Sequence, residues 1–366
     1  MVKLSKDKDR SYAIWKESNE QQFLEVYAPD YYTLGKLQGE NLEKQIRRFK
    51  EVIKLYNLTH LMKDFSYKRL LKMARAYEKF IPPYLQKEMK GVADAVVDVS
   101  YSDILLQNCF MDILYGHIIP EKMDDRFDSF DLGCTCLGVL RNKRPIIAQN
   151  FDYPYVLKSI GYFIHIITPS FKDIFSFRLG GFLGMPIALN NHISLRISII
   201  RSNMKGSIKT PGTIRCRIAL ESCSSVEEFC KVFLGEEINS SGNLLVSDQS
   251  KILGLEILPK INVKEEVTDF IVKTNTFISN SLQQYLLDKS YSKKRQLYAE
   301  KCLKRLFEEK FDEVTDLDLL QILSDRPKIN RKNPFEHMTL AFLTDKYFGL
   351  GNPKDDKAGL VPIGFI

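Results

Sequence analysis

The sequence lacks the features that mark disulfide-rich, zinc-binding or membrane-spanning proteins. Its 366 residues include seven cysteines, an odd number with no Cys-x-x-Cys pair, which argues against a disulfide framework or a zinc ribbon. No apolar run reaches the roughly 20 residues that a membrane-spanning helix needs. Met1–Arg10 is polar and basic, with no apolar stretch behind it of the kind a secretory signal carries. We therefore expect a cytoplasmic protein without a membrane span.

Histidine and clustered charge are also scarce. The five histidines are not grouped with Cys, Asp or Glu at ligand spacing, so we expect neither a metal site nor a cofactor. The net charge of +7 comes from 53 basic and 46 acidic residues, and the basic ones are mostly spread along the chain. Such a pattern is typical of a solvated surface, and we expect no nucleic-acid partner.

What the sequence does contain is a change of texture near residue 133. Before it, apolar residues recur at helical spacing, and we expect a mostly helical segment over 1–133. After it, short β-branched runs separated by turn residues predict strands, interrupted by a few helices over 134–366. The expected helices before residue 133 are Gly35–Tyr56, Tyr67–Phe80, Leu85–Val96 and Tyr101–Tyr115, and those after it are Thr213–Cys223, Ser225–Leu234, Lys293–Lys310 and Leu317–Ser324.

The change of texture coincides with a candidate nucleophile, Cys134. A small residue, Gly133, precedes it, and a β-prone run follows. Two apolar runs flank Asn142-Lys143-Arg144, a polar connection typical of a β-hairpin. A hairpin of this length brings Asp152 back beside Cys134, so a nucleophile and a carboxylate would come from neighbouring strands.

Two short motifs at these positions resemble the isopenicillin-N acyltransferase family of N-terminal-nucleophile hydrolases. They are Gly133-Cys134-Thr135 and Gln149-Asn150-Phe151-Asp152. Bile-salt hydrolases and acid-ceramidase-like amidases are more distant relatives of this family. They usually carry Arg at the position of Gln149, so a substrate-binding role for Gln149 cannot copy theirs.

The resemblance implies an α+β fold with four layers, an αββα sandwich, and a chain that cuts itself between Gly133 and Cys134. The two products, 1–133 and 134–366, would stay together as a heterodimer. Cleavage would give Cys134 a free α-amine, whose pKa of roughly 7.7–8.0 leaves a useful neutral fraction near pH 7. That amine could accept the thiol proton, so no histidine base would be needed. Asp152 would hold the amine by a charge-assisted hydrogen bond.

Further matches extend over nearly the whole chain, from about Phe23 to Pro353. Thr274-Asn275-Thr276-Phe277 is similar to the family's Thr-Asn-His-Phe, and the resemblance assigns Asn275 as an oxyanion donor. The glycine-rich run Leu179–Asn190 suggests Asn190 as a substrate-lining residue. Near the C-terminus, Arg331 stands where a substrate carboxylate could be bound.

Each of these residues has a structural alternative. Cys134 could be a small buried hydrophobic residue, as most free cysteines are. Asp152 and Asn275 could stabilise turns, and Arg331 could be a surface residue. The whole chain could be a binding or scaffold protein that keeps the fold without cleavage, or an unrelated α/β enzyme.

The resemblance favours an enzyme over these alternatives. It implies a cysteine amidohydrolase or acyltransferase, whose substrate is a small acyl amide or an acyl-CoA thioester. The acyl group would pass through a thioester on Cys134 to water or to an acceptor amine. The sequence does not give the acyl group or the acceptor.

Overall fold

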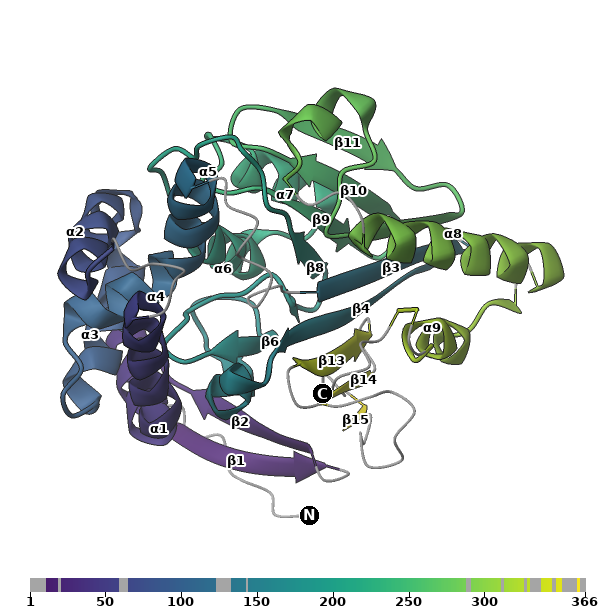
Figure 1. Cartoon of the computed structure of the whole chain (residues 1–366). Coiled ribbons are helices and arrows are strands. Elements are labelled where there is room, and N and C mark those ends of the chain that lie inside the picture. The colour runs from purple at the N-terminus through teal and green to yellow at the C-terminus, as the bar shows by residue number, and fades with distance from the viewer. Residues whose placement is uncertain are drawn as a thin grey trace, which may run out of the picture.

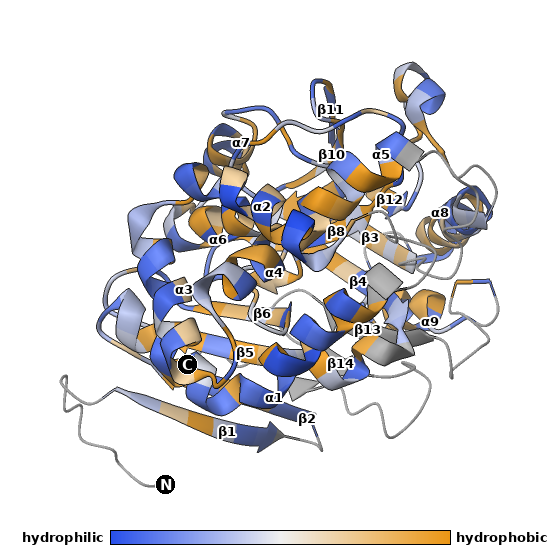
Figure 2. Ribbon diagram, turned by 60° about the vertical axis from the view of Figure 1, so that its left-hand side comes forward, coloured by the Kyte–Doolittle hydropathy of each residue, from blue (hydrophilic) through white to orange (hydrophobic). Residues whose placement is uncertain are grey.

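The structure is a computed structural model, and it describes residues 11–18, 21–58, 65–122, 133–142, 144–287, 291–310, 313–325, 328–329, 337–343, 347–350 and 361–362. Two β-sheets lie at the centre, and helices pack on both sides of the pair (Figure 1). Hydrophobic residues gather on the central strands and on α4 (Tyr101–Ile113), and hydrophilic ones are frequent at the periphery (Figure 2).

Sheet A has nine described strands and includes both ends of the expected division at residue 133. Its first two strands come from the N-terminal segment, and β2 pairs in parallel with β5, which lies after residue 133. The strands, in spatial order, are β1 (Tyr12–Ser18), β2 (Gln21–Tyr27), β5 (Gly161–Ile167), β6 (Ile174–Leu179), β7 (Ala188–Leu189), β8 (Ser194–Ile199), β9 (Gly242–Ser247), β10 (Ile252–Ile257) and β11 (Asn262–Glu266).

Sheet B has six described strands and carries the hairpin that begins at Gly133. Its order is β12 (Phe270–Thr274), β3 (Gly133–Arg141), β4 (Arg144–Pro154), β13 (His337–Leu343), β14 (Tyr347–Leu350) and β15 (Val361–Pro362). All its described pairings are antiparallel. The β3–β4 hairpin therefore occupies the middle of the sheet, with β12 on one side and β13 on the other.

Alternation along β3 shows how the two sheets are layered. The side chain of Cys136 packs with Leu245 and Ile252 of sheet A, whereas Leu137 packs on the opposite face with Ala299 and Leu303. Because neighbouring residues of a strand point to opposite faces, β3 lies between sheet A and a helical layer. That layer consists of α8 (Tyr291–Lys310) and α9 (Asp316–Leu323).

Helices also cover the outer face of sheet A. One group packs with the N-terminal part of the sheet and another with β8 to β10. These helices are α1 (Tyr31–Leu58), α2 (Tyr67–Tyr77), α3 (Pro83–Ala95), α4, α5 (Ile119–Lys122), α6 (Gly212–Ser222) and α7 (Val226–Phe233). The order helix, sheet, sheet, helix confirms the four-layer α+β sandwich expected from the sequence. None of the helices in the described part of the chain has the length and hydrophobicity needed to cross a membrane.

Glycines allow α1 and α3 to pack very closely. A Cβ atom at Gly35 would lie 2.0 Å from the carbonyl oxygen of Glu88, and one at Gly91 would lie 2.2 Å from that of Tyr32. Real Cβ atoms do not approach backbone oxygens to such distances. Any larger residue at these positions would push the helices apart.

The expected helices and most of the expected strands are present, with shifted ends. The first helix begins at Tyr31 rather than Gly35, and the strand expected over Met185–Asn190 is reduced to Ala188–Leu189. Two strands were not predicted: β1 and β11, both at edges of sheet A. Both contain charged residues at positions facing solvent, and an edge strand needs no continuous apolar run.

Candidate active site

The β3–β4 hairpin brings Cys134 and Asp152 to the same end of sheet B. Gly133 is paired with Asp152 across the hairpin, and Cys134 with Phe151. The turn at the far end is made possible by Asn142, whose φ of 44° lies in the left-handed region that asparagine tolerates. The predicted hairpin is therefore present, and Cys134 and Asp152 lie on neighbouring strands.

Two side chains hold the backbone of Cys134 on both sides. The Cys134 N–H donates to Oδ1 of Asn275 at 2.7 Å, and Nη1 of Arg295 donates to the Cys134 carbonyl oxygen at 2.6 Å. Nη2 of Arg295 also donates to Oδ1 of Asn275 at 2.8 Å. The three residues form a closed network around the first peptide groups of β3.

Arg295 was not predicted, and it is the best-connected side chain at the site. It is 1% exposed, and Nη1 donates further to Oγ1 of Thr135 at 2.8 Å, while Nη2 donates to Oγ of Ser292 at 3.2 Å. The planar guanidinium suits this role because it presents several donors in a fixed geometry. A signal for it does exist in the sequence: Ala299 and Leu303 follow Arg295 at intervals of four, which places Arg295 on the buried stripe of α8.

The segment that carries Asn275 is fixed from several directions. Nδ2 of Asn243, on β9, donates to the carbonyl oxygens of Thr274 and Thr276, both at 2.8 Å. Glu256, on β10, accepts hydrogen bonds from the N–H groups of Ile278 and Ser279 and an ion pair from Lys273. Sheet A therefore sets the position of Asn275 opposite Cys134.

Asn275 is oriented with its oxygen toward Cys134. Its Nδ2 donates to the carbonyl oxygen of Ile199 at 2.8 Å, and the second hydrogen of Nδ2 bonds to no residue in the described part of the chain. In the uncut chain the amide therefore holds the Cys134 N–H. The predicted donation to an oxyanion stays a prediction.

The Cys134 thiol is fully buried and electrostatically disfavoured as a thiolate in the uncut chain. Burial, with smaller contributions from Cys136 and Asp152, raises the pKa of Cys134 well above its ordinary value. The hydrogen bond from the Asn275 side chain and the charge of Arg295 act in the opposite direction and do not offset burial. The uncut thiol is protonated at neutral pH.

The two other described residues that we expected to bind substrate make bonds within the fold. Gln149 is buried between the sheets and exchanges hydrogen bonds with the backbone of Ile197 on β8, at 2.7 and 3.2 Å. Asn190 donates to the carbonyl oxygens of Leu220 and Cys223 and accepts from two N–H groups of its own turn. Their substrate-binding roles stay predictions. Arg331 lies outside the described residues.

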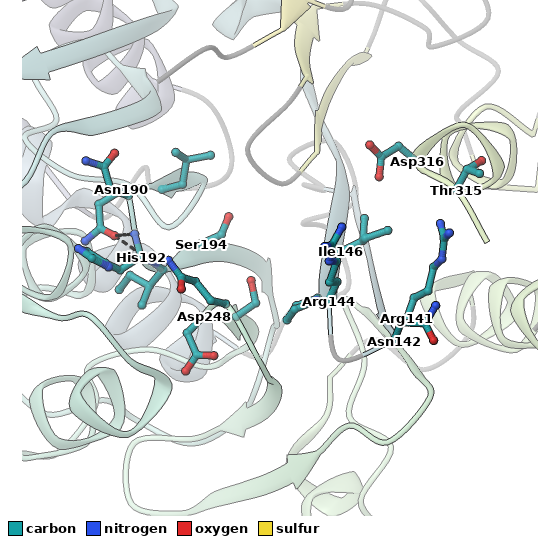
Figure 3. Close-up of a pocket in the computed structure, with 16 residues that line it drawn as sticks. Arg141, Asn142, Arg144, Ile146, Asn190, His192, Ser194, Asp248, Thr315 and Asp316 are labelled. Carbon is teal, nitrogen blue, oxygen red and sulfur yellow. Dashed lines mark hydrogen bonds between the residues drawn. The ribbon is translucent and has the colours of Figure 1, made fainter. Parts of the chain in front are cut away.

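The histidines nearest in sequence to Cys134 also have other surroundings. Nε2 of His117 lies 2.8 Å from the hydroxyl oxygen of Tyr77, in the helical layer over sheet A. His192 lines a cavity of about 910 Å³ (Figure 3). No three His, Cys, Asp or Glu side chains among the described residues come together in an arrangement that could hold a metal ion.

That cavity is at the opposite end of the hairpin from Cys134. Arg141 and Arg144 border it on one side, and Asn190, His192 and Asp248 on the other (Figure 3). Seven residues of extended strand separate Cys134 from Arg141, a distance of about 23 Å. The cavity is therefore not part of the site around Cys134.

Comparisons with known proteins agree with this architecture. The chain is 30% identical over 172 residues to an uncharacterized protein of Archaeoglobus fulgidus, in a match that covers 44% of this chain and 29% of that protein. The chain thus spans less than a third of that relative. Among solved structures, the Caenorhabditis elegans ortholog of N-acylethanolamine-hydrolyzing acid amidase matches with a TM-score of 0.45 and 17% identity, over 57% of this chain and 92% of that one.

A family comparison covers more than half of the chain. Residues 139–338 match the sequence model of the acyl-coenzyme A:6-aminopenicillanic acid acyl-transferase family. The match begins just after Cys134 and includes Asp152, Asn275 and Arg295. With the hairpin, the network around Cys134 and the paired sheets described above, this match shows that the chain belongs to the acyl-coenzyme A:6-aminopenicillanic acid acyl-transferase family.

Proposed function

We propose that the protein cuts its own chain between Gly133 and Cys134 and then acts as a cysteine N-terminal-nucleophile amidohydrolase or acyltransferase. The observation that carries this proposal is the network around Cys134. Asn275 holds its N–H, Arg295 holds its carbonyl group, and Asp152 stands opposite Gly133. A buried cysteine with only a packing role would not need its backbone held by two side chains that are themselves connected.

In the cleavage step, the Cys134 sulfur attacks the carbonyl carbon of Gly133. The new C–S bond replaces the C–N bond, and the Cys134 nitrogen takes a proton to become an amine. Water then hydrolyses the thioester, leaving a carboxylate on Gly133 and a thiol on Cys134. The bond from Asn275 to the Cys134 N–H supports this step, because it fixes the nitrogen that must leave.

In the mature enzyme, the same contacts would position an α-amine. Oδ1 of Asn275 would accept from that amine, and Asp152 would hold it by charge. The neutral amine takes the thiol proton as the sulfur attacks the substrate carbonyl and returns it to the leaving amine or thiol. The acyl group rests on sulfur until water or an acceptor amine attacks. A thioester suits such transfer because it stays reactive toward amines.

The acyl-enzyme is the species to look for. Cut protein should be mixed with a panel of N-acyl amides and acyl-CoA thioesters, quenched in acid and weighed by mass spectrometry. The proposal predicts an acyl adduct on residues 134–366 that maps to Cys134 and is absent from Cys134→Ala. An uncut chain that forms no adduct would favour the binding or scaffold alternative instead.

The identity of the base can be tested on the same adduct. The rate of acyl-enzyme formation should rise with pH as the amine–thiol pair loses its proton, because only the neutral amine can accept the thiol proton. Asp152→Asn should slow both cleavage and acylation. His117→Ala and His192→Ala should leave acylation largely intact. Loss of the adduct in either histidine variant, in folded and cut protein, would assign a histidine as the base.

A further inference from the structure

Aromatic rings border Cys134 on the face of the hairpin that looks toward sheet A. Cys134 and Phe151 are directly paired, so their side chains share a face, and Tyr153 follows two residues later on that face. The rings of Phe151 and Tyr153 are stacked with centroids 5.4 Å apart. Phe177, from sheet A, lies 6.1 Å from the first and 5.8 Å from the second.

The hydroxyl group of Tyr153 is the exception in this apolar cluster. Tyr153 is fully buried, and its Oη makes no hydrogen bond with any residue in the described part of the chain. Leaving a buried polar group unpaired costs about 1–3 kcal/mol. Phenylalanine would fill the same space without this cost, so the hydroxyl calls for an explanation.

The surroundings of Oη show what it could bind. Gly161, at the start of β5, lies beside it: a Cβ atom there would be only 3.6 Å from Oη and 2.7 Å from the ring of Phe177. Burial alone raises the pKa of Tyr153 above its usual value, so the group is an O–H donor at neutral pH. A charged ligand group would lose its hydration here without a charged partner. A neutral acceptor, such as a carbonyl or ether oxygen, fits this donor.

We propose that the acyl group of the substrate lies against Phe151, Tyr153 and Phe177, and that Tyr153 Oη donates a hydrogen bond to a neutral oxygen within that acyl group. This inference rests on the proposed acyl transfer by Cys134. It specifies the substrate class as apolar, ring-containing acyl groups that carry one uncharged hydrogen-bond acceptor away from the reacting carbonyl. Room for the acyl group comes from cleavage, which frees Gly133 from Cys134 at the edge of the cluster.

The test uses cut protein and acyl thioesters of N-acetylcysteamine. One probe carries a plain phenylalkanoyl group, and the others have one chain methylene at a time replaced by a keto carbonyl. Wild type should acylate fastest with one of the keto probes. In Tyr153→Phe that preference should fall roughly five- to tenfold, which is the range expected for one neutral hydrogen bond, while the rate with the plain probe stays within about twofold.

A matched control is Tyr162→Phe. Tyr162 is also buried, but its Oη donates to the carbonyl oxygen of Gly180 at 2.8 Å, so it already has a partner in the fold. This variant should lose thermal stability and keep the keto preference. Tyr153→Phe should not lose stability, because it removes an unpaired group.

The outcomes separate this inference from the function on which it rests. Wild type that acylates Cys134 with no keto preference, or Tyr153→Phe that keeps the preference, would overturn the role of Tyr153 and leave acyl transfer standing. Wild type that forms no adduct on Cys134 with any probe would overturn both.

Discussion

At the scale of single residues, the site is defined by what holds the main chain of Cys134. Asn275 and Arg295 contact its N–H and its carbonyl oxygen, and they also contact each other. In the uncut chain the N–H belongs to a peptide bond, and after cleavage the same nitrogen would be an amine. The network can therefore serve both stages without rearrangement of the strands.

The role of Asn275 can be divided by two substitutions. Asn275→Ala removes both the acceptor and the donor, and if Nδ2 stabilises the oxyanion, acylation should fall about 10²–10³-fold. Asn275→Asp keeps an oxygen for the α-amine and loses the N–H donor, so cleavage should be less affected than acylation. Rates of acyl-enzyme formation and of chain cleavage give the comparison. A change below about tenfold in both rates, with unaltered thermal stability, would leave Asn275 as a turn residue.

Arg295 offers a test in which charge is kept and geometry is lost. Lysine cannot reach Cys134, Thr135 and Asn275 together, so Arg295→Lys should slow acylation by about tenfold to a hundredfold. Arg305→Lys is the control, because Arg305 lies on the same helix and its side chain is 77% exposed. Acylation rates and thermal midpoints of both variants should be measured. Equal rates in Arg295→Lys and wild type would remove Arg295 from the site.

The sequence predicted part of this site and missed the rest for physical reasons. Cys134, Asp152 and Asn275 lie in short motifs, and hairpin spacing alone predicts the first two to be neighbours. Arg295 lies in a segment rich in Lys and Arg, where only its helical phase distinguishes it. The bonds that occupy Gln149 and Asn190 join elements far apart in the sequence, and no local pattern shows them.

At the scale of elements, the pairing of β2 with β5 joins the segments on either side of Cys134. Glu25 on β2 faces His165 on β5, with Oε2 and Nδ1 3.4 Å apart, and Oε2 of Glu25 also pairs with Lys16 on β1 at 2.6 Å. Burial would raise the pKa of Glu25, but the bonds to His165 and Lys16 outweigh it and lower this pKa to about 2. The charged carboxylate therefore stabilises the folded sheet.

This ion pair predicts an acid-sensitive contribution to stability. A carboxylate with a lowered pKa contributes its full stabilisation above the model value of 4.5 and loses it as the pH falls toward about 2. Glu25→Gln should lower the free energy of unfolding at neutral pH by about 1–2 kcal/mol and reduce its decline between these pH values. Denaturant unfolding across this range measures both effects.

Glu17→Gln is the matched control for that measurement. Glu17 lies on β1 and makes an exposed hydrogen bond with Gln22, so its substitution should change stability little. If Glu25→Gln and Glu17→Gln behaved alike at every pH, the contribution assigned to the β2–β5 ion pair would be wrong.

At the scale of the whole molecule, the two predicted products are too interlinked to separate. The segment before Cys134 contributes β1 and β2 to sheet A and the helices that cover it. Glu88 of α3 is fully buried and accepts two hydrogen bonds from Arg217 of α6, at 2.9 and 3.2 Å. Removing one partner of such a pair typically costs 3–5 kcal/mol. We therefore expect the pieces 1–133 and 134–366 to remain one particle.

The overall layering was predicted from the order of helices and strands, but the interlinking was not. Nothing local in the residues of β2 specifies parallel pairing with β5, more than 130 residues later. Such pairing depends on the whole sheet and on the helices packed against it. A division at residue 133 is thus a division of the chain and not of the fold.

The most direct test of the account is the mass of the purified protein, measured under native and denaturing conditions. We predict that denatured wild type separates into two chains, one ending at Gly133 and one beginning at Cys134, and that native wild type keeps both in one particle. Cys134→Ala should remain a single chain of 366 residues. Wild type that stays a single chain and still acylates its substrate would contradict the N-terminal-nucleophile mechanism.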